Sequence, residues 1–577
     1  VYLPALLSGD LLLIGVVAIA MMLAWSGANA VSASFFAEQF PTRVRYTGTA
    51  VGSQLGMIVV GFSPTIMIGL MGKGGVTWPS ECFGLIVTQG GSEQAVEIRG
   101  GENLLKVLSS LGYEINAVCA GNGSCHKCKV KILYPFVEPA ERELSALTAE
   151  EIENGIRLAC AVTLREETGV EIISSGNMEV LQSETASGTA PQGKIRAVFD
   201  IGTTTLVAAL TDGEGRVIAS AGEKNRQASF GADVITRVKY VTNGGLKELC
   251  DTVTGQANAM LKQLLAENGP ETIKDITLSG NTAMLHLFLG RDCSGLGYAP
   301  YTAQFLASQT INGKDLGFDF GVPVRTLPCI ASFAGGDLTA GIVSEYTNSE
   351  KYTLLIDLGT NAEIALYNRE RILASSAAAG PAFEGASIKQ GMGATPGAVC
   401  SYEYTEGRAK VKTIGDARPA GICGSGLIDI AAELLNHDII DETGYLLSGD
   451  KIEVCEGVSL FAQDVRELQL AKAAIAAAID MLLLRAGLTA DDIERVLIGG
   501  GFGSYINPAN AARIGLFPQE LQKKTAAAGN TSLAGGILCA AFPEKRALAE
   551  HIAASAQYID LTNSAEFSDC YIEHMMF

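Results

Sequence analysis

The chain has 577 residues, 48% of them hydrophobic, which is enough for several domains with buried cores. Its 62 acidic and 42 basic residues give a formal net charge of -20, which argues against broad binding to the phosphate backbone of nucleic acid. The 13 cysteines are an odd number and mostly stand far apart, so a secreted disulfide framework is excluded in favour of a reducing, cytoplasmic setting.

Residues 1–76 differ from the rest of the chain and read as a membrane-type helical segment. Residues 11–25 are almost entirely apolar, and residues 51–71 carry no charge and are long enough to cross a bilayer. The loop between them, residues 37–48, resembles the loop before a late helix of major-facilitator metabolite/proton symporters. Two helices cannot form such a transporter, and the arginines of the loop would place the following domains outside, where no ATP is available. We interpret this segment as a fusion scar, with a genuine membrane anchor as the alternative.

A soluble pattern begins at Phe83. Strand-like runs at residues 84–88 and 95–98 are followed by a short helix at residues 103–110. Four cysteines come next, three in a C-x5-C-x2-C loop and one further along: Cys119, Cys125, Cys128 and Cys160. We therefore expect a ferredoxin-like domain over residues 77–180.

The cysteine spacing indicates a [2Fe-2S] cluster held by all four thiolates. The glycines of the loop permit the backbone to wrap closely around an inorganic core. The loop is one residue longer than the plant-type C-x4-C-x2-C pattern and resembles the longer-loop ferredoxins of adrenodoxin type. The alternative is a structural zinc site, which normally uses two C-x2-C pairs where this chain has one.

Three residues near the predicted ligands carry or can carry positive charge. His126 lies between two of the cysteines. Because four cysteines already complete the ligand set, we interpret His126 as solvated or as a neighbour of the ligands. Lys127 and Lys129 would raise the potential of a cluster or attract an acidic partner, with a merely solvated face as the alternative.

Residues 181–194 are rich in small and polar residues, which predicts a flexible linker. A buried strand follows and ends at Asp200, and the next turn contains Gly202, Thr203 and Thr204. The glycine lets the backbone approach a phosphate, the threonines supply donors, and the aspartate can hold a Mg²⁺-bound water. Such a turn is a weak signal when it occurs once.

The same strand, Asp-x-Gly-Thr turn and strand occur again further along, with Asp357, Gly359 and Thr360 in the turn. Here the chain resembles the superfamily of acetate and sugar kinases, heat-shock chaperones and actin, in which two related lobes each give one such loop to the phosphates of ATP. The resemblance implies one lobe over residues 195–345 and a second over residues 346–577, with the two aspartates as the catalytic pair that positions Mg²⁺ and water.

Further segments fit the same resemblance. Three glycines after a predicted strand match its adenosine motif: Gly499, Gly500 and Gly501. A second glycine cluster at residues 421–426 either lies against the nucleoside or packs at a helix start. Asn281 either lies near the nucleotide or caps a helix, and Asp337 is undecided. The alanine-rich residues 471–488 predict a helix without chemistry.

Residues 83–577 taken together resemble the reductive activators of corrinoid-dependent proteins. The resemblance rests on the order of the domains and on three stretches: residues 378–392, 464–475 and 529–535. It implies an α/β fold in which a β-grasp [2Fe-2S] ferredoxin-like domain precedes a two-lobed actin/sugar-kinase-like ATPase. Glu363 and Lys389 are weaker candidates for the active cleft.

The resemblance also implies a reaction. A corrinoid protein of a methyltransferase system that has been oxidised to Co(II) is returned to Co(I) by one electron, and an upstream reductase or ferredoxin resupplies the activator. ATP is required because the reduction is uphill, at roughly 1.4 kcal/mol for each 59 mV of deficit. Whether the chain forms a homodimer is left open.

Three alternatives from other classes remain at this point. A small-molecule kinase would use the same ATP core without an electron carrier. An activator of radical dehydratases also couples ATP to electron transfer, but holds a [4Fe-4S] cluster between subunits. A non-enzymatic redox sensor would bind nucleotide without hydrolysing it.

Overall fold

The structure is a computed structural model. It describes residues 82–577 except 90–91, 112, 114, 116–125, 127, 145, 174–194, 269–272, 406–407, 501–505 and 563. The apolar helices predicted for residues 1–76 therefore lie outside the described residues. Among the helices that are described, none combines the length and the apolar character needed to cross a bilayer.

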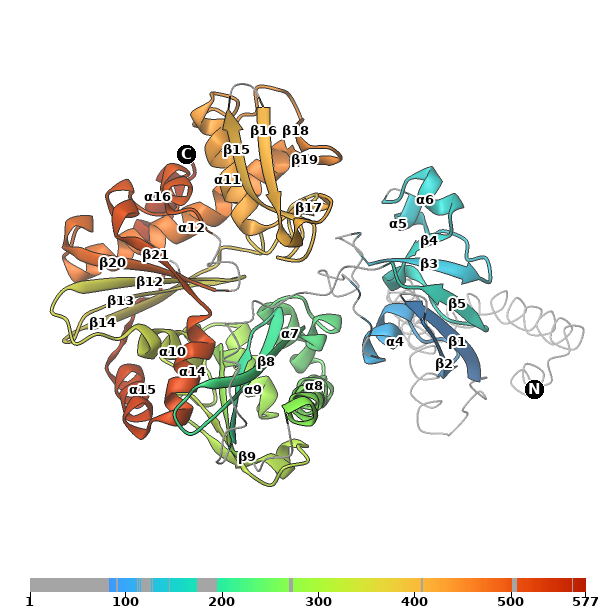
Figure 1. Ribbon diagram of the computed structural model, residues 1–577, viewed down its shortest axis with the longest axis horizontal. Helices are drawn as coiled ribbons and strands as arrows, with labels where there is room; N and C mark the ends of the chain where they lie inside the picture. The colour runs from blue at the N-terminus through green and yellow to red at the C-terminus, as the bar shows by residue number, and fades with distance from the viewer. Residues whose placement is uncertain are drawn as a thin grey trace, which may run out of the picture. The chain divides into compact units, whose positions relative to one another are not determined.

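The first described domain is a five-stranded sheet in the order β2-β1-β5-β3-β4 with helix α4 against it (Figure 1). Its elements are β1 (Cys82–Gln89), β2 (Ser92–Arg99), α4 (Leu104–Ser110), β3 (Lys129–Tyr134), α5 (Glu141–Leu144), α6 (Ala149–Glu153), β4 (Ile156–Leu158) and β5 (Thr168–Glu171). Leu85 and Val87 alternate with more exposed neighbours along β1 and are fully buried with Leu104 and Leu108 of α4. This confirms the predicted β-grasp domain.

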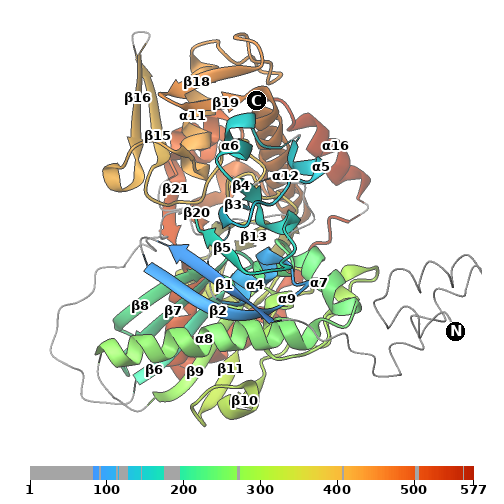
Figure 2. The same cartoon turned by 90° about the vertical axis from the view of Figure 1, so that its right-hand side faces the viewer.

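The next sheet has the order β10-β11-β9-β6-β7-β8. Its elements are β6 (Ile195–Ile201), β7 (Thr205–Thr211), β8 (Val217–Lys224), α7 (Val234–Thr242), α8 (Leu246–Asn268), β9 (Ile273–Gly280), α9 (Thr282–Phe288), β10 (Thr310–Asn312), β11 (Pro323–Thr326) and α10 (Gly336–Glu345). Strands β6, β7 and β8 form an antiparallel meander, and β9 pairs in parallel with β6. The long helix α8 runs across this sheet (Figure 2) and packs on β7 and β8.

The third sheet repeats this plan in the order β21-β20-β12-β13-β14-β22. Its elements are β12 (Tyr352–Leu358), β13 (Ala362–Tyr367), β14 (Ile372–Ala377), β20 (Ile493–Gly499), β21 (Thr525–Gly529) and β22 (Gln557–Tyr558). Strands β12, β13 and β14 again form an antiparallel meander, and β20 pairs in parallel with β12. The shared strand order means that β6 and β12 are equivalent strands of two related lobes, which confirms the predicted two-lobed fold.

The second lobe carries additional elements around a large apolar core. They are β15 (Ala398–Thr405), β16 (Arg408–Thr413), β17 (Gly421–Ile422), α11 (Gly424–Asn436), β18 (Lys451–Cys455), β19 (Val458–Phe461), α12 (Ala462–Ala486), α13 (Pro508–Arg513), α14 (Thr531–Ala541), α15 (Pro543–Ser555) and α16 (Ala565–Glu573). The predicted helix over residues 471–488 corresponds to α12, which begins nine residues earlier. Asp464, fully buried, accepts hydrogen bonds from the backbone N–H groups of Phe461 and Lys389 and so fixes that start.

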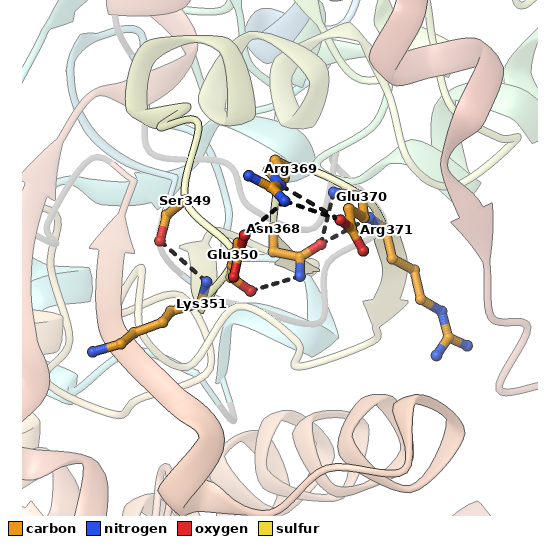
Figure 3. Close-up of polar contacts among 7 residues, drawn as sticks. All are labelled: Ser349, Glu350, Lys351, Asn368, Arg369, Glu370 and Arg371. Atoms are coloured by element: carbon orange, nitrogen blue, oxygen red, sulfur yellow. Dashed lines mark hydrogen bonds and ion pairs between the residues drawn. The ribbon is translucent and has the colours of Figure 1, made fainter.

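A polar cluster marks the beginning of the second lobe (Figure 3): Ser349, Glu350, Lys351, Asn368, Arg369, Glu370 and Arg371. The Asn368 side chain accepts from the backbone N–H groups of Glu370 and Arg371, at 2.9 and 2.8 Å. Its Nδ2 donates to the carbonyl of Glu350 at 2.8 Å. Asn368 therefore closes the β13–β14 hairpin and ties it to the segment before β12.

Helices α10 and α14 cross closely and bring the two sheets into contact (Figure 1). A Cβ atom placed on Gly535 of α14 would lie 1.9 Å from the carbonyl oxygen of Ala340 in α10, so only glycine fits there. Helix α14 follows β21 of the second lobe and also packs on β6 and β9 of the first lobe. Its N-terminus thus lies where the ends of β6 and β12 meet.

Candidate functional site

The described part of the predicted cluster site contains two of the four cysteines. Cys128 immediately precedes β3 and Cys160 follows β4, and both are buried. The backbone N–H of Ala159 donates to the carbonyl of Cys128 at 2.8 Å, which places the two cysteine segments side by side. Cys119 and Cys125 lie outside the described residues. Two thiols from neighbouring segments beside a glycine-bearing loop fit the donor set of a [2Fe-2S] cluster.

Polar side chains hold the Cys160 segment in place. Asn103 Nδ2 and Arg142 Nη2 both donate to the Cys160 carbonyl, at 3.1 and 2.7 Å. Arg142 therefore brings positive charge to this region. Lys129 forms an ion pair of 2.6 Å with Glu151, which offsets the positive charge expected from that lysine, and Lys127 lies outside the described residues.

The ends of β6 and β12 bring Asp200 and Asp357 to one place, and the start of α14 contacts both. Asn530 Nδ2 donates to Asp200 Oδ2 at 2.8 Å, and Ser532 Oγ donates to Asp200 Oδ1 at 2.7 Å. Between them, Thr531 Oγ1 lies 3.4 Å from Asp357 Oδ2. Three consecutive residues thus hold the aspartates of both lobes.

The first turn is closed tightly at a position that only glycine can occupy. The N–H of Gly202 donates to the carbonyl of Thr205 at 2.9 Å, and a Cβ on Gly202 would lie 2.7 Å from that oxygen. Asn281 caps α9 by accepting from the Met284 N–H, and its Nδ2 also donates to Thr203 Oγ1 at 3.1 Å. Asn281 therefore caps a helix, as one of its two alternatives predicted, and it also contacts the first loop.

Two more carboxyl groups lie beside the two aspartates. Asp337 and Glu363 share a hydrogen bond. Burial and the neighbouring charges of Asp337 and Asp200 raise the pKa of Asp357 to about 7. Burial raises the pKa of Asp337 to about 6, and burial with the charges of Asp337 and Asp357 raises the pKa of Glu363. This concentration of negative charge favours a bound cation.

The glycines that the sequence predicts to bind adenosine lie next to the second aspartate. Gly500 follows β20 with a φ of 102°, and a Cβ there would lie 3.1 Å from Asp357 Oδ1. Gly499 lies directly beside it, whereas Gly501 is outside the described residues. The other glycine cluster, residues 421–426, begins α11, where a Cβ on Gly426 would lie 2.0 Å from the carbonyl oxygen of Val399. Gly426 therefore packs at a helix start.

Among the described residues, no three His, Cys, Asp or Glu side chains are grouped so as to enclose a metal ion by themselves. This is compatible with Mg²⁺, which is usually bound by one or two carboxylates together with waters and substrate phosphates. Asp200 and Asp357 are the carboxylates that would hold it.

Three family models match successive parts of the chain. The "2Fe-2S iron-sulfur cluster binding domain" matches residues 87–165, the "RACo middle region" matches residues 196–349, and the "C-terminal domain of RACo the ASKHA domain" matches residues 351–577. The boundary between the last two falls in the polar cluster of Figure 3.

Relatives extend this result across domains. The chain is 31% identical over 414 residues to the corrinoid activation enzyme RamQ of Eubacterium limosum, a match that covers 66% of this chain and 70% of that protein. The chain belongs to the reductive activators of corrinoid proteins. A second member, the Co(II) methylated amine-specific corrinoid protein reductase of Methanosarcina barkeri, is 29% identical over 299 residues, covering 45% of this chain and 54% of that protein.

A solved structure agrees with membership among the corrinoid activators. The structure titled "Reductive activator for corrinoid,iron-sulfur protein" is 28% identical, superposes with a TM-score of 0.62, and covers 86% of this chain and 98% of that chain. The family models that match this chain identify a [2Fe-2S] cluster and ATP as the cofactors of this corrinoid activator.

The structure separates the two weaker candidates of this activator. Glu363 lies with Asp337 in the acidic group. Lys389 is exposed, and its Nζ lies 4.1 Å from the centre of the Phe461 ring, a cation–π contact at the start of α12. Lys389 is therefore engaged by a side chain of the second lobe.

Sequence reasoning assigned no role to several residues that contact the two loops. Ser532 bonds Asp200, and the buried Arg237 donates from Nη2 to the carbonyl of Thr203 at 2.5 Å. Glu384 accepts hydrogen bonds from Thr204 and Thr360. The available signal was indirect, because Glu384 and Ser532 stand within the stretches that carry the family resemblance.

Proposed function

We propose that this chain uses ATP to drive one electron from a [2Fe-2S] cluster to a Co(II) corrinoid protein, returning the cobalt to Co(I). The observation that carries the proposal is the meeting of Asp200 and Asp357 at the start of α14, in a chain that also has a ferredoxin domain. A cluster held by Cys119, Cys125, Cys128 and Cys160 would supply electrons one at a time.

In the cleft, Asp200 and Asp357 would position Mg²⁺ and its waters. Both are catalytic residues in this proposal. The phosphates would be bound by the backbone and hydroxyl groups of the two repeated loops: Gly202, Thr203, Thr204, Gly359 and Thr360. The adenosine would lie against Gly499, Gly500 and Gly501. The raised pKa of Asp357 supports this assignment, because a nearby cation stabilises the charged form of a buried carboxyl group.

Coupling between the two halves of the reaction follows from the fold. The residues that hold both aspartates begin α14, which follows β21 of the second lobe and packs on β6 and β9 of the first. Binding of ATP phosphates at the two loops would therefore act on the crossing of α10 and α14. A shift of the two lobes can begin there. Such a shift would change how the corrinoid partner is bound.

We further propose the division of labour along the chain. Residues 77–180 carry the electron, residues 181–194 act as the flexible tether, and residues 195–345 and 346–577 form the two ATPase lobes. The setting is cytoplasmic, where ATP and reduced thiols are available. The partners are a corrinoid protein of a methyltransferase system and an upstream reductase or ferredoxin, and self-association remains to be measured.

The test is ATP hydrolysis by the anaerobically purified protein, with iron content recorded alongside. We expect two irons per chain and faster hydrolysis when a Co(II) corrinoid protein is added. Asp357→Ala should abolish hydrolysis while the visible absorption of the cluster is unchanged. Hydrolysis that ignores the corrinoid protein would contradict the proposal, and loss of both signals in the variant would indicate global misfolding.

The same assay separates the three alternatives. A small-molecule kinase would form ADP only with its own substrate, a radical dehydratase activator would contain four irons per cluster, and a redox sensor would not turn ATP over. None of them is favoured by the relatives, which are a corrinoid activation enzyme and a corrinoid protein reductase.

A further inference from the structure

One carboxylate joins the two repeated loops directly. Glu384 lies in the turn that follows β14, and its Oε2 accepts a hydrogen bond from Thr204 Oγ1 at 3.1 Å and another from Thr360 Oγ1 at 2.9 Å. Thr204 belongs to the loop of the first lobe and Thr360 to the loop of the second. A single oxygen atom therefore bridges the two lobes at the place where both Asp-x-Gly-Thr turns open.

The threonines cannot serve this carboxylate and a phosphate at the same time. A threonine hydroxyl has one hydrogen to donate. When it donates to Glu384, it has none for a phosphate oxygen, and when it donates to a phosphate it releases the carboxylate. Nucleotide binding at these loops would thus exchange one anionic acceptor for another and would leave Glu384 beside the phosphates.

The position of Glu384 is fixed from both sides. Its neighbours Ala382 and Phe383 are buried in the core of the second lobe. On the other side, the fully buried Arg237 donates to the carbonyl of Thr203, and its charge favours the ionised form of Glu384 while burial raises the Glu384 pKa. Because Asp200 already accepts from Asn530 and Ser532, Glu384 is the carboxylate that the phosphates themselves would release.

Resting on the ATP hydrolysis proposed above, we propose that Glu384 is a catalytic residue: once the phosphates have taken over the hydroxyls of Thr204 and Thr360, its carboxylate orients the attacking water. The bond between the water oxygen and the γ-phosphorus forms as the bond from the γ-phosphorus to the bridging oxygen breaks. The proton leaving the water passes to the Glu384 carboxylate, and ADP departs with the bridging oxygen.

The test compares Glu384→Gln with the wild-type chain. The glutamine keeps an oxygen that can accept from both threonines, so the fold and the loop geometry are retained, but it cannot take a proton. We expect the kcat of ATP hydrolysis to fall about 100-fold or more. The Kd for ATP, measured by calorimetry, should stay within about threefold of wild type or become tighter. Glu370→Gln, at an exposed glutamate of the Figure 3 cluster, is the matched control.

The outcomes separate this inference from the proposed function. Hydrolysis by Glu384→Gln at a rate within about threefold of wild type would overturn the catalytic role alone. Loss of ATP binding together with hydrolysis would also overturn it, because the residue would then be structural. Absence of hydrolysis in the wild-type protein with its Co(II) partner would overturn the proposed function as well. If Glu384→Gln fails to fold, Glu384→Asp decides, since a wild-type rate there contradicts a positioned carboxylate.

Discussion

At the scale of single residues, the candidate site is defined by carboxyl groups that are held close together. Asp200 and Asp357 end equivalent strands, and Asp337 and Glu363 lie beside them. Like charges at short range raise one another's pKa, and burial adds to the effect. Ionisation of these carboxyl groups above neutral pH therefore destabilises the fold, and bound Mg²⁺ with nucleotide would remove this destabilisation.

Because of this destabilisation, removing the charge of Asp357 should stabilise the folded protein by an amount that depends on pH. The pKa of Asp357 is raised to about 7, above its value in the unfolded chain, so its contribution to stability is present at low pH and is lost as the pH rises from about 4 to 7. Asp357→Asn keeps the shape of the side chain and removes the charge. We expect a gain in the free energy of unfolding on the order of 1 kcal/mol or more at pH 8, and a clearly smaller gain at pH 5.

The measurement is the melting temperature of the nucleotide-free protein at both pH values. Asp491→Asn, at an exposed aspartate of the second lobe, controls for removal of a surface charge. An increase in melting temperature at pH 5 as large as that at pH 8 would show that the charge of Asp357 does not destabilise the nucleotide-free protein.

Part of this group of residues could be predicted from the sequence. The repeated Asp-x-Gly-Thr turn indicated two loops, because the pattern is local and occurs twice. Glu384 could not be placed, since its partners stand 24 and 180 positions away and only the folded chain brings them together. The same holds for Ser532, which is 332 positions from Asp200.

At the scale of elements, α10 and α14 pack closely where the two lobes meet. Gly535 allows the helices to approach until the backbone of Ala340 is in contact. We expect Gly535→Ala to force the helices apart and to cost about 1–3 kcal/mol of stability. Because α14 begins with the residues that hold both aspartates, ATP affinity should fall as well.

Gly255 supplies the matched control for this substitution. It also lies inside a helix, α8, but no atom lies within 4 Å of a Cβ placed there. Gly255→Ala should stabilise the protein by about 0.5–1 kcal/mol, since alanine is the better helix former. Equal effects of the two variants in thermal melting would contradict a close helix crossing.

The ends of helices and strands can be predicted from the sequence only where local patterns determine them. The strand-like runs at residues 84–88 and 95–98 correspond to β1 and β2, because alternation of buried side chains is a local property. The start of α12 was missed, since it depends on the buried Asp464, whose partner Lys389 is distant in sequence. Helix propensity alone predicts only the alanine-rich C-terminal part of that helix.

At the scale of the whole molecule, the chain joins an electron carrier to an ATPase of two related lobes. The fold class was predictable because each part has its own local pattern: a cysteine loop in one and a duplicated turn in the other. The five-strand order that the two large sheets share was not, since it depends on pairings such as β6 with β9 and β12 with β20. The predictions for residues 1–76, Cys119 and Cys125 concern residues outside those that the structure describes.

The most direct test of the central claim is the appearance of Co(I) in a corrinoid protein, followed by its absorption spectrum after mixing with the reduced protein. The account predicts that Co(I) forms when Mg²⁺ and ATP are present and fails to accumulate when ATP is omitted or Asp357→Ala is used. Formation of Co(I) at the same rate and to the same extent without ATP would contradict it.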